Sequence, residues 1–470
     1  MVVRAALAAG ILAALAGPAL AQAGSGQCDA LRLSELRLQG AHNAYHIGLG
    51  LEELRGMAGV SNIGFGSRVR DEREGNEATA PLLQVLGYTH PPLQSQLTSG
   101  VRALELDVYK DTSGGRYARR ALAKAVFATS ASGVQALDSP GFKVMHTPDI
   151  DYNTHCHTFV ECLTQVADWS SSNPSHLPIF IYVEYKTGAA GDRLGEVLGD
   201  DPDELERFLE EYLQKIPGEP NGLQTAETAV AADWDAIEAE ILAAVPRSQI
   251  LSPSDARDFH VASCGGTVAA DGSSGPCARS FQLPTVADAR GKIVFVRANG
   301  GGFRFTGRGP SEPDAAYSNS VMFAELSGGD PAAQSGAVAN NQFGPDAIFI
   351  NAGGRQLDDT GPDAFVELNA LLAEGRFLRG NLGTIPTPTT KPYRGQNEVQ
   401  AEWTAFNGRI QVSASDVLYD QTLGTVERWT TLRLNAQTDS AIVCGDASSA
   451  ARAALSGVVA AAVMLVVLLA

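Results

Sequence analysis

Short apolar runs recur along this chain and alternate with stretches of helical spacing, and this alternation restricts the fold more than any other feature. Continuous apolar runs of about four to eight residues are typical of strands that are buried on both faces. We expect strands at Leu36–Ala41, Val101–Val108, Phe142–His146, Ile179–Glu184, Gln249–Ser252, Lys292–Val296, Ala347–Asn351 and Ile410–Ala414. Helices are expected at Thr158–Ser171, Asp201–Lys215, Asp233–Val245 and Pro362–Glu374.

This number of strands, with helices between several of them, predicts an α/β fold and specifically a (β/α)8 TIM-type barrel. An open doubly wound sheet is the alternative. The barrel is preferred because polar residues stand mostly at the carboxyl ends of the first four strands, the end at which barrels build their active sites. Two long connections leave strands at that end, and residues 47–89 and 111–141 are therefore predicted to be insertions. Solvated surface segments are the favoured interpretation, and segments that shape access to a site are the alternative.

The polar residues at these strand ends belong to types that bind metals or transfer protons. They are His42, Asn43, Glu105, Asp107, His146 and Glu184. Side chains two positions apart on a strand share a face, so Glu105 and Asp107 project together. With Glu184 they make three carboxylates, which cannot all stay ionised at close range without a compensating charge.

A hard divalent cation supplies that compensation. An all-oxygen set that adds the amide of Asn43 to the carboxylates suits Ca²⁺ better than Zn²⁺. The alternative is that the carboxylates pair with Arg102 or Lys186 and hold no metal. Lys186 is also a candidate for contact with an anionic phosphate, and His90, just before the helix start Pro91–Leu93, is a candidate at the rim of the site.

His42 and His146 bracket the carboxylates. Two imidazoles beside a cation suit general base and general acid roles, in which one accepts a proton from a nucleophilic hydroxyl and the other protonates the departing oxygen. Asp149 and Asp151 follow His146 closely, and either is placed to orient an imidazole. The remaining histidines of this region, His46, His155 and His157, are expected to be structural.

Both ends of the chain resemble targeting segments. Residues 1–23 combine one early arginine, an apolar run and small residues, as a signal peptide does. Residues 447–470 place small residues before an apolar tail, which predicts a GPI-attachment signal or, alternatively, a membrane-anchoring helix. Residues 24–446 would then form one domain, exported and tethered to the outer face of a membrane.

The chain has 6 cysteines, which in an exported protein suggest disulfides. Spacing favours Cys156–Cys162 and Cys264–Cys277 as local loops, which leaves Cys28–Cys444. A metal site built from Cys156, Cys162 and the neighbouring histidines is the alternative. The formal net charge of −18 argues against nucleic acid as a partner.

Several ordered motifs resemble the calcium-dependent phosphatidylinositol-specific phospholipase C family, known from secreted bacterial enzymes. They include Gln39-Gly40-Ala41-His42-Asn43-Ala44-Tyr45-His46, His90-Pro91-Pro92-Leu93, Leu104-Glu105-Leu106-Asp107-Val108, His146-Thr147-Pro148-Asp149-Ile150-Asp151 and Leu177-Pro178-Ile179-Phe180-Ile181. The resemblance covers most of the chain and is strongest over residues 36–186.

The resemblance implies a barrel of the phospholipase C-like phosphodiesterase kind and Ca²⁺ as cofactor. It implies His42 and His146 as catalytic residues, and Asn43, Glu105, Asp107 and Glu184 as Ca²⁺ ligands. The implied reaction cleaves a phosphatidylinositol-type phospholipid to diacylglycerol and an inositol phosphate, by a protein expected to be a monomer. The alternatives are a glycerophosphodiester phosphodiesterase and a non-catalytic Ca²⁺-binding surface protein on the same barrel.

Overall fold

The computed structural model describes residues 28–50, 53, 88–120, 131–149, 151–188, 224–230, 232–265, 282–298, 320–327, 349–351, 377–381 and 412–415. Its strands are β1 (Leu38–Ala41), β2 (Ala103–Tyr109), β3 (Lys143–Val144), β4 (Ile179–Tyr185), β5 (Ile293–Ala298), β6 (Met322–Ser327), β7 (Phe349–Asn351), β8 (Phe377–Asn381) and β9 (Val412–Ser415). Its α-helices are α6 (Leu93–Thr98), α8 (Phe159–Ser172), α11 (Asp233–Ala244), α12 (Pro253–Ser263) and α13 (Val286–Ala289). Short 3-10 helices are η1 (Leu33–Glu35), η3 (Arg116–Ala118), η4 (Gln135–Asp138) and η5 (Arg247–Gln249).

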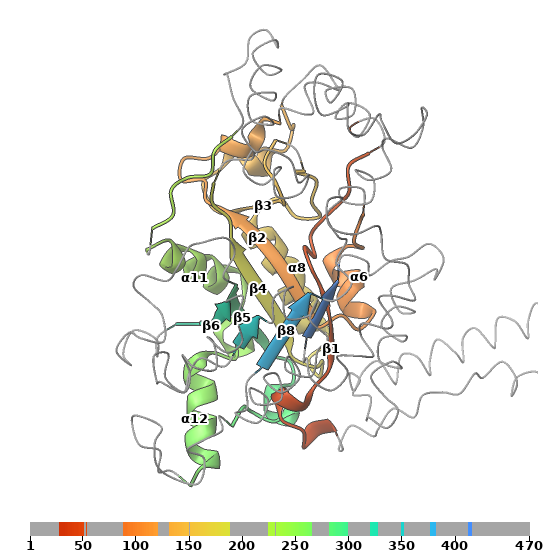
Figure 1. The fold of residues 1–470 in the computed structure, drawn as a ribbon, viewed down its shortest axis with the longest axis vertical. Helices are drawn as coiled ribbons and strands as arrows, with labels where there is room; N and C mark the ends of the chain where they lie inside the picture. The colour runs from red at the N-terminus through yellow and green to blue at the C-terminus, as the bar shows by residue number, and fades with distance from the viewer. Residues whose placement is uncertain are drawn as a thin grey trace, which may run out of the picture.

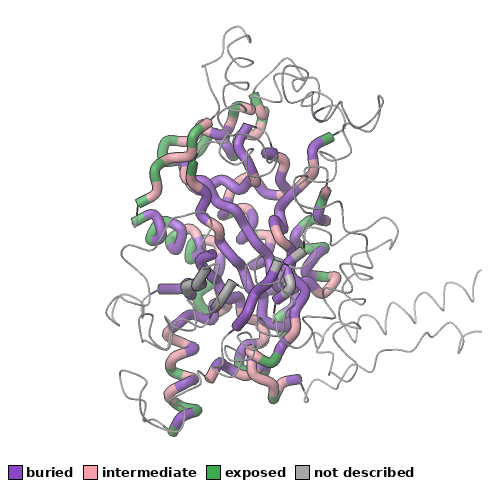
Figure 2. The backbone as a smooth tube through the Cα atoms, viewed as in Figure 1, coloured by how far each residue is buried: buried purple, intermediate pink, exposed green. Residues whose placement is uncertain are grey.

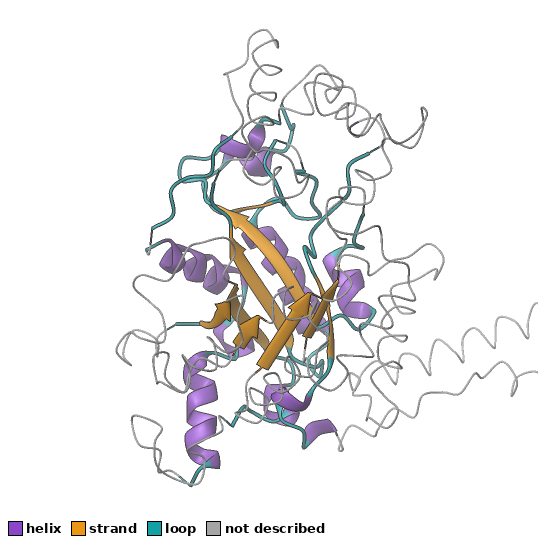
Figure 3. Cartoon of the chain, viewed as in Figure 1, coloured by secondary structure: helices purple, strands orange, loops and turns teal. Residues whose placement is uncertain are grey.

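The strands form one mainly parallel sheet at the centre of the molecule, with helices outside it (Figures 1 and 3). Parallel pairing runs β1–β2–β4–β5–β6–β7–β8–β9 and returns from β9 to β1. Each parallel strand thus has a parallel neighbour on both sides, and β3 is added to β2 in the antiparallel sense. The predicted α/β class is confirmed.

Two predicted parallel strands are wrong. The run 142–146 forms only the two-residue antiparallel β3, because the chain turns again at Thr147, which bridges Asp151. The run 249–252 is the end of η5 followed by one bridge from Ile250 to Ile293, since Ser252 already caps α12.

Two parallel strands, β6 and β8, were not predicted. Each contains a charged residue in the middle of a short run, Glu325 in β6 and Arg379 in β8. These charges interrupt the apolar pattern by which the other strands are recognised. The expected helices at 158–171 and 233–245 are present as α8 and α11, whereas those at 201–215 and 362–374 lie outside the described residues.

Alternating side chains divide the interior into two cores, and most strand residues whose burial is described are buried (Figure 2). Outward residues of β2 and β4, such as Leu106 and Ile181, pack with residues of α8 and α11, such as Phe159 and Ile237, in an outer core. The residues between them on the strands form an inner core: Ala103, Phe180, Tyr182, Val294, Val296, Phe323, Phe349, Phe377 and Val412. Four phenylalanines of this inner core contact one another.

Gly40 shows why β1 fits between its two neighbours. A Cβ atom there would lie 3.0 Å from Val412 Cγ1 and 3.2 Å from Ala103 Cβ, on β9 and β2. The absence of a side chain therefore allows β1 to pair with both strands and to deliver His42 at its carboxyl end.

The disulfide Cys156–Cys162 is confirmed, and it occupies the thiols that the alternative metal site would need. Cys28 and Cys264 are also disulfide-bonded, but their expected partners Cys444 and Cys277 lie outside the described residues. So do the expected signal peptide, the C-terminal tail and most of the insertion 47–89. Among the residues that the structure describes, no helix combines the length and apolar character needed to cross a membrane.

The inner core generates a test of the fold. Phe180 is fully buried and stacks on Phe377 with ring centroids 4.7 Å apart. We expect Phe180→Ala to lower the free energy of unfolding by about 3–5 kcal/mol, because it leaves a cavity among the other rings. Leu242→Ala, on the exposed face of α11, is the control and should change it by less than about 0.5 kcal/mol. Chemical denaturation measures both, and equal effects would contradict this core.

Candidate metal and catalytic site

The three carboxylates of interest follow the inner core along the same strand faces. Glu105 and Asp107 come two and four positions after Ala103 on β2, and Glu184 comes two after Tyr182 on β4. Asp107 and Glu184 are register partners across the parallel β2–β4 pair. One oxygen of each of the three carboxylates lies within 4.8 Å of the others. The structure thus brings Glu105, Asp107 and Glu184 together, as the alternation along the strands predicts.

Two buried cations lie against these carboxylates. Lys186 Nζ is 3.2 Å from Asp107 Oδ2 and also contacts Glu184 Oε1. Arg379 Nη2, from β8, is 2.7 Å from Glu105 Oε1, and its guanidinium lies 4.6 Å from the centre of the Tyr182 ring. The predicted alternative, in which the carboxylates pair with a cationic side chain, is therefore observed for Lys186.

Arg102 is not part of this cluster. Its Nη1 donates hydrogen bonds to the carbonyl oxygens of Leu97 and Val101, and its guanidinium lies 5.0 Å from the centre of the Trp169 ring. Burial lowers the pKa of Arg102 to about 9. Its role is to support the turn between α6 and β2.

Unequal surroundings separate the pKa values of the two β2 carboxylates. Burial raises the pKa of Asp107 to about 6, Lys186 opposes this, and Glu184 and Glu105 add to it. Burial acts in the same direction on Glu105, but Arg379, His42 and Lys186 outweigh it and lower the pKa of Glu105 to about 2. Glu105 is thus held as a carboxylate, whereas the ionised form of Asp107 is disfavoured in this cluster.

His42 and Asn43 follow β1, and both contact Glu105 of β2. His42 Nε2 is 3.5 Å from Glu105 Oε2, and the half-buried His42 ring keeps 24% of its side-chain surface exposed. Asn43 adopts a left-handed backbone conformation with φ 49°, which asparagine tolerates, and its backbone N–H donates to Glu105 Oε2 at 3.2 Å. The Asn43 side chain accepts from the Tyr45 hydroxyl at 3.3 Å and donates to the Tyr88 hydroxyl at 3.0 Å.

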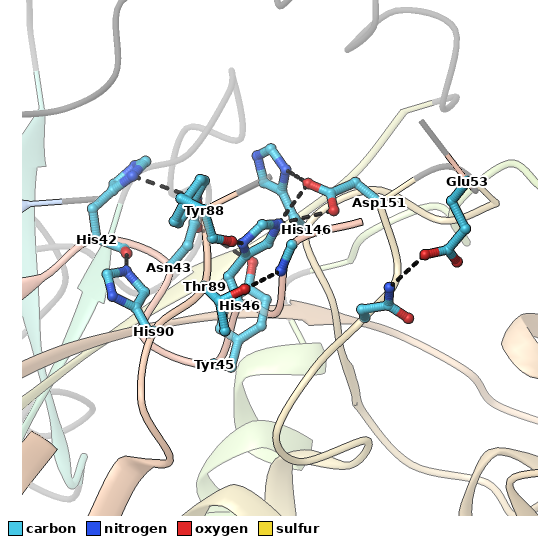
Figure 4. A network of polar contacts seen from close by, with 12 residues as sticks. His42, Asn43, Tyr45, His46, Glu53, Tyr88, Thr89, His90, His146 and Asp151 are labelled. Carbon is cyan, nitrogen blue, oxygen red and sulfur yellow. Dashed lines mark hydrogen bonds and ion pairs between the residues drawn. The ribbon is translucent and has the colours of Figure 1, made fainter. Parts of the chain in front are cut away.

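His146 is held on the other side of Tyr88 in the view of Figure 4. Its Nδ1 lies 2.7 Å from Asp151 Oδ2, and 19% of its side-chain surface is exposed. Asp151 also contacts the buried His46, whose ring stacks on Tyr88 with centroids 4.1 Å apart. Of the two candidate aspartates, Asp151 is therefore the one beside His146, while Asp149 accepts a hydrogen bond from the backbone of Gln224.

Two further histidines, His90 and His155, contact backbone carbonyl oxygens next to this site. His90 is buried, and its Nε2 is 2.8 Å from the carbonyl oxygen of His42, so it supports the backbone of His42 rather than standing at an exposed rim. His155 Nε2 in turn lies 2.6 Å from the carbonyl oxygen of His90. Burial lowers the pKa of His155 and of His157.

The three carboxylates are compatible with one bound Ca²⁺. Ligand oxygens lie about 2.3–2.6 Å from Ca²⁺, so oxygens up to about 5 Å apart can share one ion. The observed separation is within 4.8 Å, and the three negative charges exceed the two positive charges of Lys186 and Arg379. An oxygen-only donor set with residual negative charge suits a hard cation.

The protein therefore combines an α/β fold with an acidic cluster on two parallel strands, His42 after the parallel strand β1 and His146 on a loop after the antiparallel β3. Residues 31–219 match the model of a family described as phosphoinositide phospholipase C, Ca²⁺-dependent. Over these residues the predicted resemblance to that family is confirmed. No curated protein shows significant sequence similarity to the chain.

Solved structures of several bacterial enzymes resemble the chain at low identity. A calcium-dependent phosphoinositol-specific phospholipase C from Pseudomonas sp. is 14% identical, with a TM-score of 0.44, over 83% of this chain and 91% of that one. A Ca²⁺-dependent phosphatidylinositol-specific phospholipase C from Streptomyces antibioticus is 15% identical, with a TM-score of 0.35, over 87% and 98%. A phosphatidylinositol-specific phospholipase C from Listeria monocytogenes is 11% identical, with a TM-score of 0.35, over 85% and 94%.

Three contributors to the site were not recognised in the sequence. Arg379 lies in a strand that was not predicted, and Tyr88 lies at the end of an expected insertion. His46 was expected to be structural, yet it contacts Asp151. A signal for Tyr88 and His46 did exist, since His46 ends one motif of the resemblance and Tyr88 comes two residues before another.

Arg379 generates a test of the charge balance. We expect Arg379→Met to lower the free energy of unfolding at neutral pH by about 3–5 kcal/mol, because it leaves Glu105 buried without its main partner. Lys292→Met, a lysine whose Nζ bonds only the Ser248 carbonyl among the described residues, is the control and should cost less than about 1 kcal/mol.

The pH dependence of this loss has a definite sign. A carboxyl whose pKa is lowered by folding contributes stability that is present above its unfolded pKa and is lost as the pH falls through its folded pKa. Wild-type protein should therefore lose the stability that Glu105 contributes as the pH falls from 4.5, the ordinary pKa of this carboxyl, to about 2, its pKa in the folded protein. Arg379→Met should lack that part of the profile, and a destabilisation that is constant from pH 7 to pH 2 would contradict the assignment.

Proposed function

We propose that this protein is a Ca²⁺-dependent phosphodiesterase that cleaves phosphatidylinositol-type phospholipids to diacylglycerol and an inositol phosphate. The observation that carries the proposal is the convergence of Glu105, Asp107 and Glu184 beside His42, with His146 on the neighbouring loop. The family match over residues 31–219 supports the same class of reaction.

We further infer that the fold is a (β/α)8 TIM-type barrel of the phospholipase C-like kind. The return of the parallel pairing from β9 to β1 supports this inference, as does the inner core enclosed by those strands. In such a barrel the carboxyl ends of the strands surround one site, which is where His42 and Glu184 stand.

Glu105, Asp107 and Glu184 would hold the Ca²⁺, together with Asn43. A bound cation supplies neutralisation of the charge that develops on the phosphate oxygens during the displacement. Lys186, beside Asp107 and Glu184, is the residue of the cluster best placed to meet a phosphate.

His42 and His146 would transfer the two protons of the reaction. His42 accepts the proton of the inositol 2-hydroxyl, whose oxygen attacks phosphorus. His146 donates a proton to the diacylglycerol oxygen as its bond to phosphorus breaks. We assign the acid role to His146 because Asp151 Oδ2 lies 2.7 Å from its Nδ1, which leaves its Nε2 to meet the departing oxygen.

The location of the protein is part of the proposal. We propose that residues 1–23 direct export, that residues 24–446 form the catalytic domain and that residues 447–470 tether the protein to the outer surface of a membrane. A tethered monomer would meet phospholipid substrates at the bilayer without needing electrostatic adhesion, which the net charge of −18 opposes.

Hydrolysis assays test the function. Wild-type protein should release diacylglycerol from phosphatidylinositol vesicles with Ca²⁺ and should lose this activity with a chelator. His42→Ala should lower kcat by about 10²–10⁴-fold, as expected for loss of a general base. His157→Ala is the matched control, since this half-buried histidine lies in the loop before α8 and outside the proposed site, and it should keep near-wild-type turnover.

Three outcomes would contradict the proposal. Activity that survives chelation would remove the role of Ca²⁺. Turnover of glycerophosphoinositol alone would assign the protein as a glycerophosphodiester phosphodiesterase. Ca²⁺ binding without hydrolysis of any of these phosphodiesters would identify a binding protein.

A further inference from the structure

One carboxylate lies between two imidazoles at the edge of the proposed site. Asp151 Oδ2 is 2.7 Å from His146 Nδ1, and the two Asp151 oxygens are 2.8 and 2.9 Å from His46 Nε2 (Figure 4). Asp151 is 1% exposed and His46 is 0% exposed, whereas His146 is half-buried. Only the His146 end of this chain of contacts therefore reaches the surface at which substrate would bind.

The backbone fixes Asp151 in this position. The N–H of Thr147 donates to the carbonyl oxygen of Asp151 at 2.9 Å, and the N–H of Asp151 donates to the carbonyl oxygen of Thr147 at 2.9 Å. Asp149 supports the turn between them with φ 67°, in the left-handed region. The segment from His146 to Asp151 thus folds back so that its last carboxylate meets the first imidazole.

His46 lies on the other side of the Asp151 carboxylate from His146. Its Nδ1 is 3.0 Å from the carbonyl oxygen of Tyr88, and its Nε2 faces Asp151. Both partners are acceptors, so the ring donates to both only when it carries two protons. Burial acts to raise the pKa of Asp151, but His46 and the hydrogen bonds from both histidines outweigh it and hold that pKa well below its ordinary value.

We propose that Asp151, held by His46, is a positioning residue that keeps the proton on His146 Nδ1 and leaves His146 Nε2 as the atom that delivers a proton to the leaving group. This inference rests on the proposed function for its consequence in catalysis. In the step, the Nε2–H bond breaks as the diacylglycerol oxygen takes the proton and parts from phosphorus. The Nδ1 proton stays on the ring, and Asp151 remains ionised.

A purely structural role for Asp151 is the competing explanation, and the backbone contacts around it argue against it. The N–H of Ile47 donates to the Asn153 carbonyl at 3.2 Å, and the N–H of His155 donates to the Tyr45 carbonyl at 2.9 Å. These bonds join the same two loops without the Asp151 side chain, so an isosteric variant at 151 should still fold.

The dependence on the leaving group tests the proposal. Asp151→Asn should lower kcat for phosphatidylinositol by about 10²-fold or more at unchanged KM, because proton donation to an alkoxide is impaired. It should affect the 4-nitrophenyl ester of inositol phosphate by only a few fold, since that leaving group departs without a proton. Asp149→Asn, on the same turn, is the matched control and should leave the ratio of the two rates at its wild-type value.

Similar losses with both substrates, or a change in KM alone, would overturn the positioning role. A second measurement does not need turnover. Nitrogen NMR of ¹⁵N-histidine-labelled protein, with His146 assigned by substitution, should show Nδ1 protonated in wild type and a mixture of tautomers in Asp151→Asn. His46→Gln should move the signal in the same direction, because Asp151 loses the imidazole that holds its carboxylate in place.

The two measurements distinguish failure of the proposed function from failure of the positioning role of Asp151. If wild-type protein hydrolyses no inositol phosphodiester, the proposed function fails, and the NMR signal still decides whether Asp151 sets the tautomer. If wild-type protein is active and Asp151→Asn preserves both the tautomer and the ratio of rates, the positioning role fails while the function stands.

Discussion

Repulsion among three carboxylates on neighbouring parallel strands is the constraint on which the rest of this site depends. Asp107 and Glu184 are register partners, and Glu105 is two positions before Asp107 on the same face. Burial of such charges is costly unless cations lie close to them. Lys186 and Arg379 offset two of the three charges, and the raised pKa of Asp107 marks the charge that remains. That remainder is the physical reason for proposing a divalent cation at this place.

The inner core explains why the charges can converge at all. Below the carboxylates the same strand faces carry Phe180 and Tyr182 of β4 and Phe377 of β8, which pack against the other rings of the inner core. This apolar layer fixes the spacing of the strands. The polar residues further along the same strands are therefore held at the same spacing. Tyr182 joins the two layers directly, because the guanidinium of Arg379 lies over its ring.

Much of the site was predictable because it follows strand periodicity. Glu105, Asp107 and Glu184 lie on long apolar strands, so alternation alone places them on one face. The Cys156–Cys162 loop followed from spacing in the same way. Arg379 was not predictable, because its strand is short and the arginine itself breaks the apolar run. The choice of Asp151 over Asp149 depends on a turn with a left-handed residue, which the spacing of carboxylates does not encode.

The histidine side of the site is built differently from the metal side. Its groups come from loops, and they are joined by contacts between His46, Tyr88, Asp151 and His146 rather than by strand register. Under the proposed function, the carboxylates would hold a cation and Asp151 would orient His146 as the proton donor. On the carboxylate side, burial together with Glu184 and Glu105 outweighs Lys186 and raises the pKa of Asp107.

A crystal structure of the full chain at saturating Ca²⁺, with the ion located by anomalous scattering, would show directly whether these carboxylates bind the metal. We expect one ion bound by oxygens of Glu105, Asp107 and Glu184 together with Asn43, and Lys186 displaced from between Asp107 and Glu184. A structure in which Lys186 keeps both carboxylates while no ion lies beside Asp107 would contradict it.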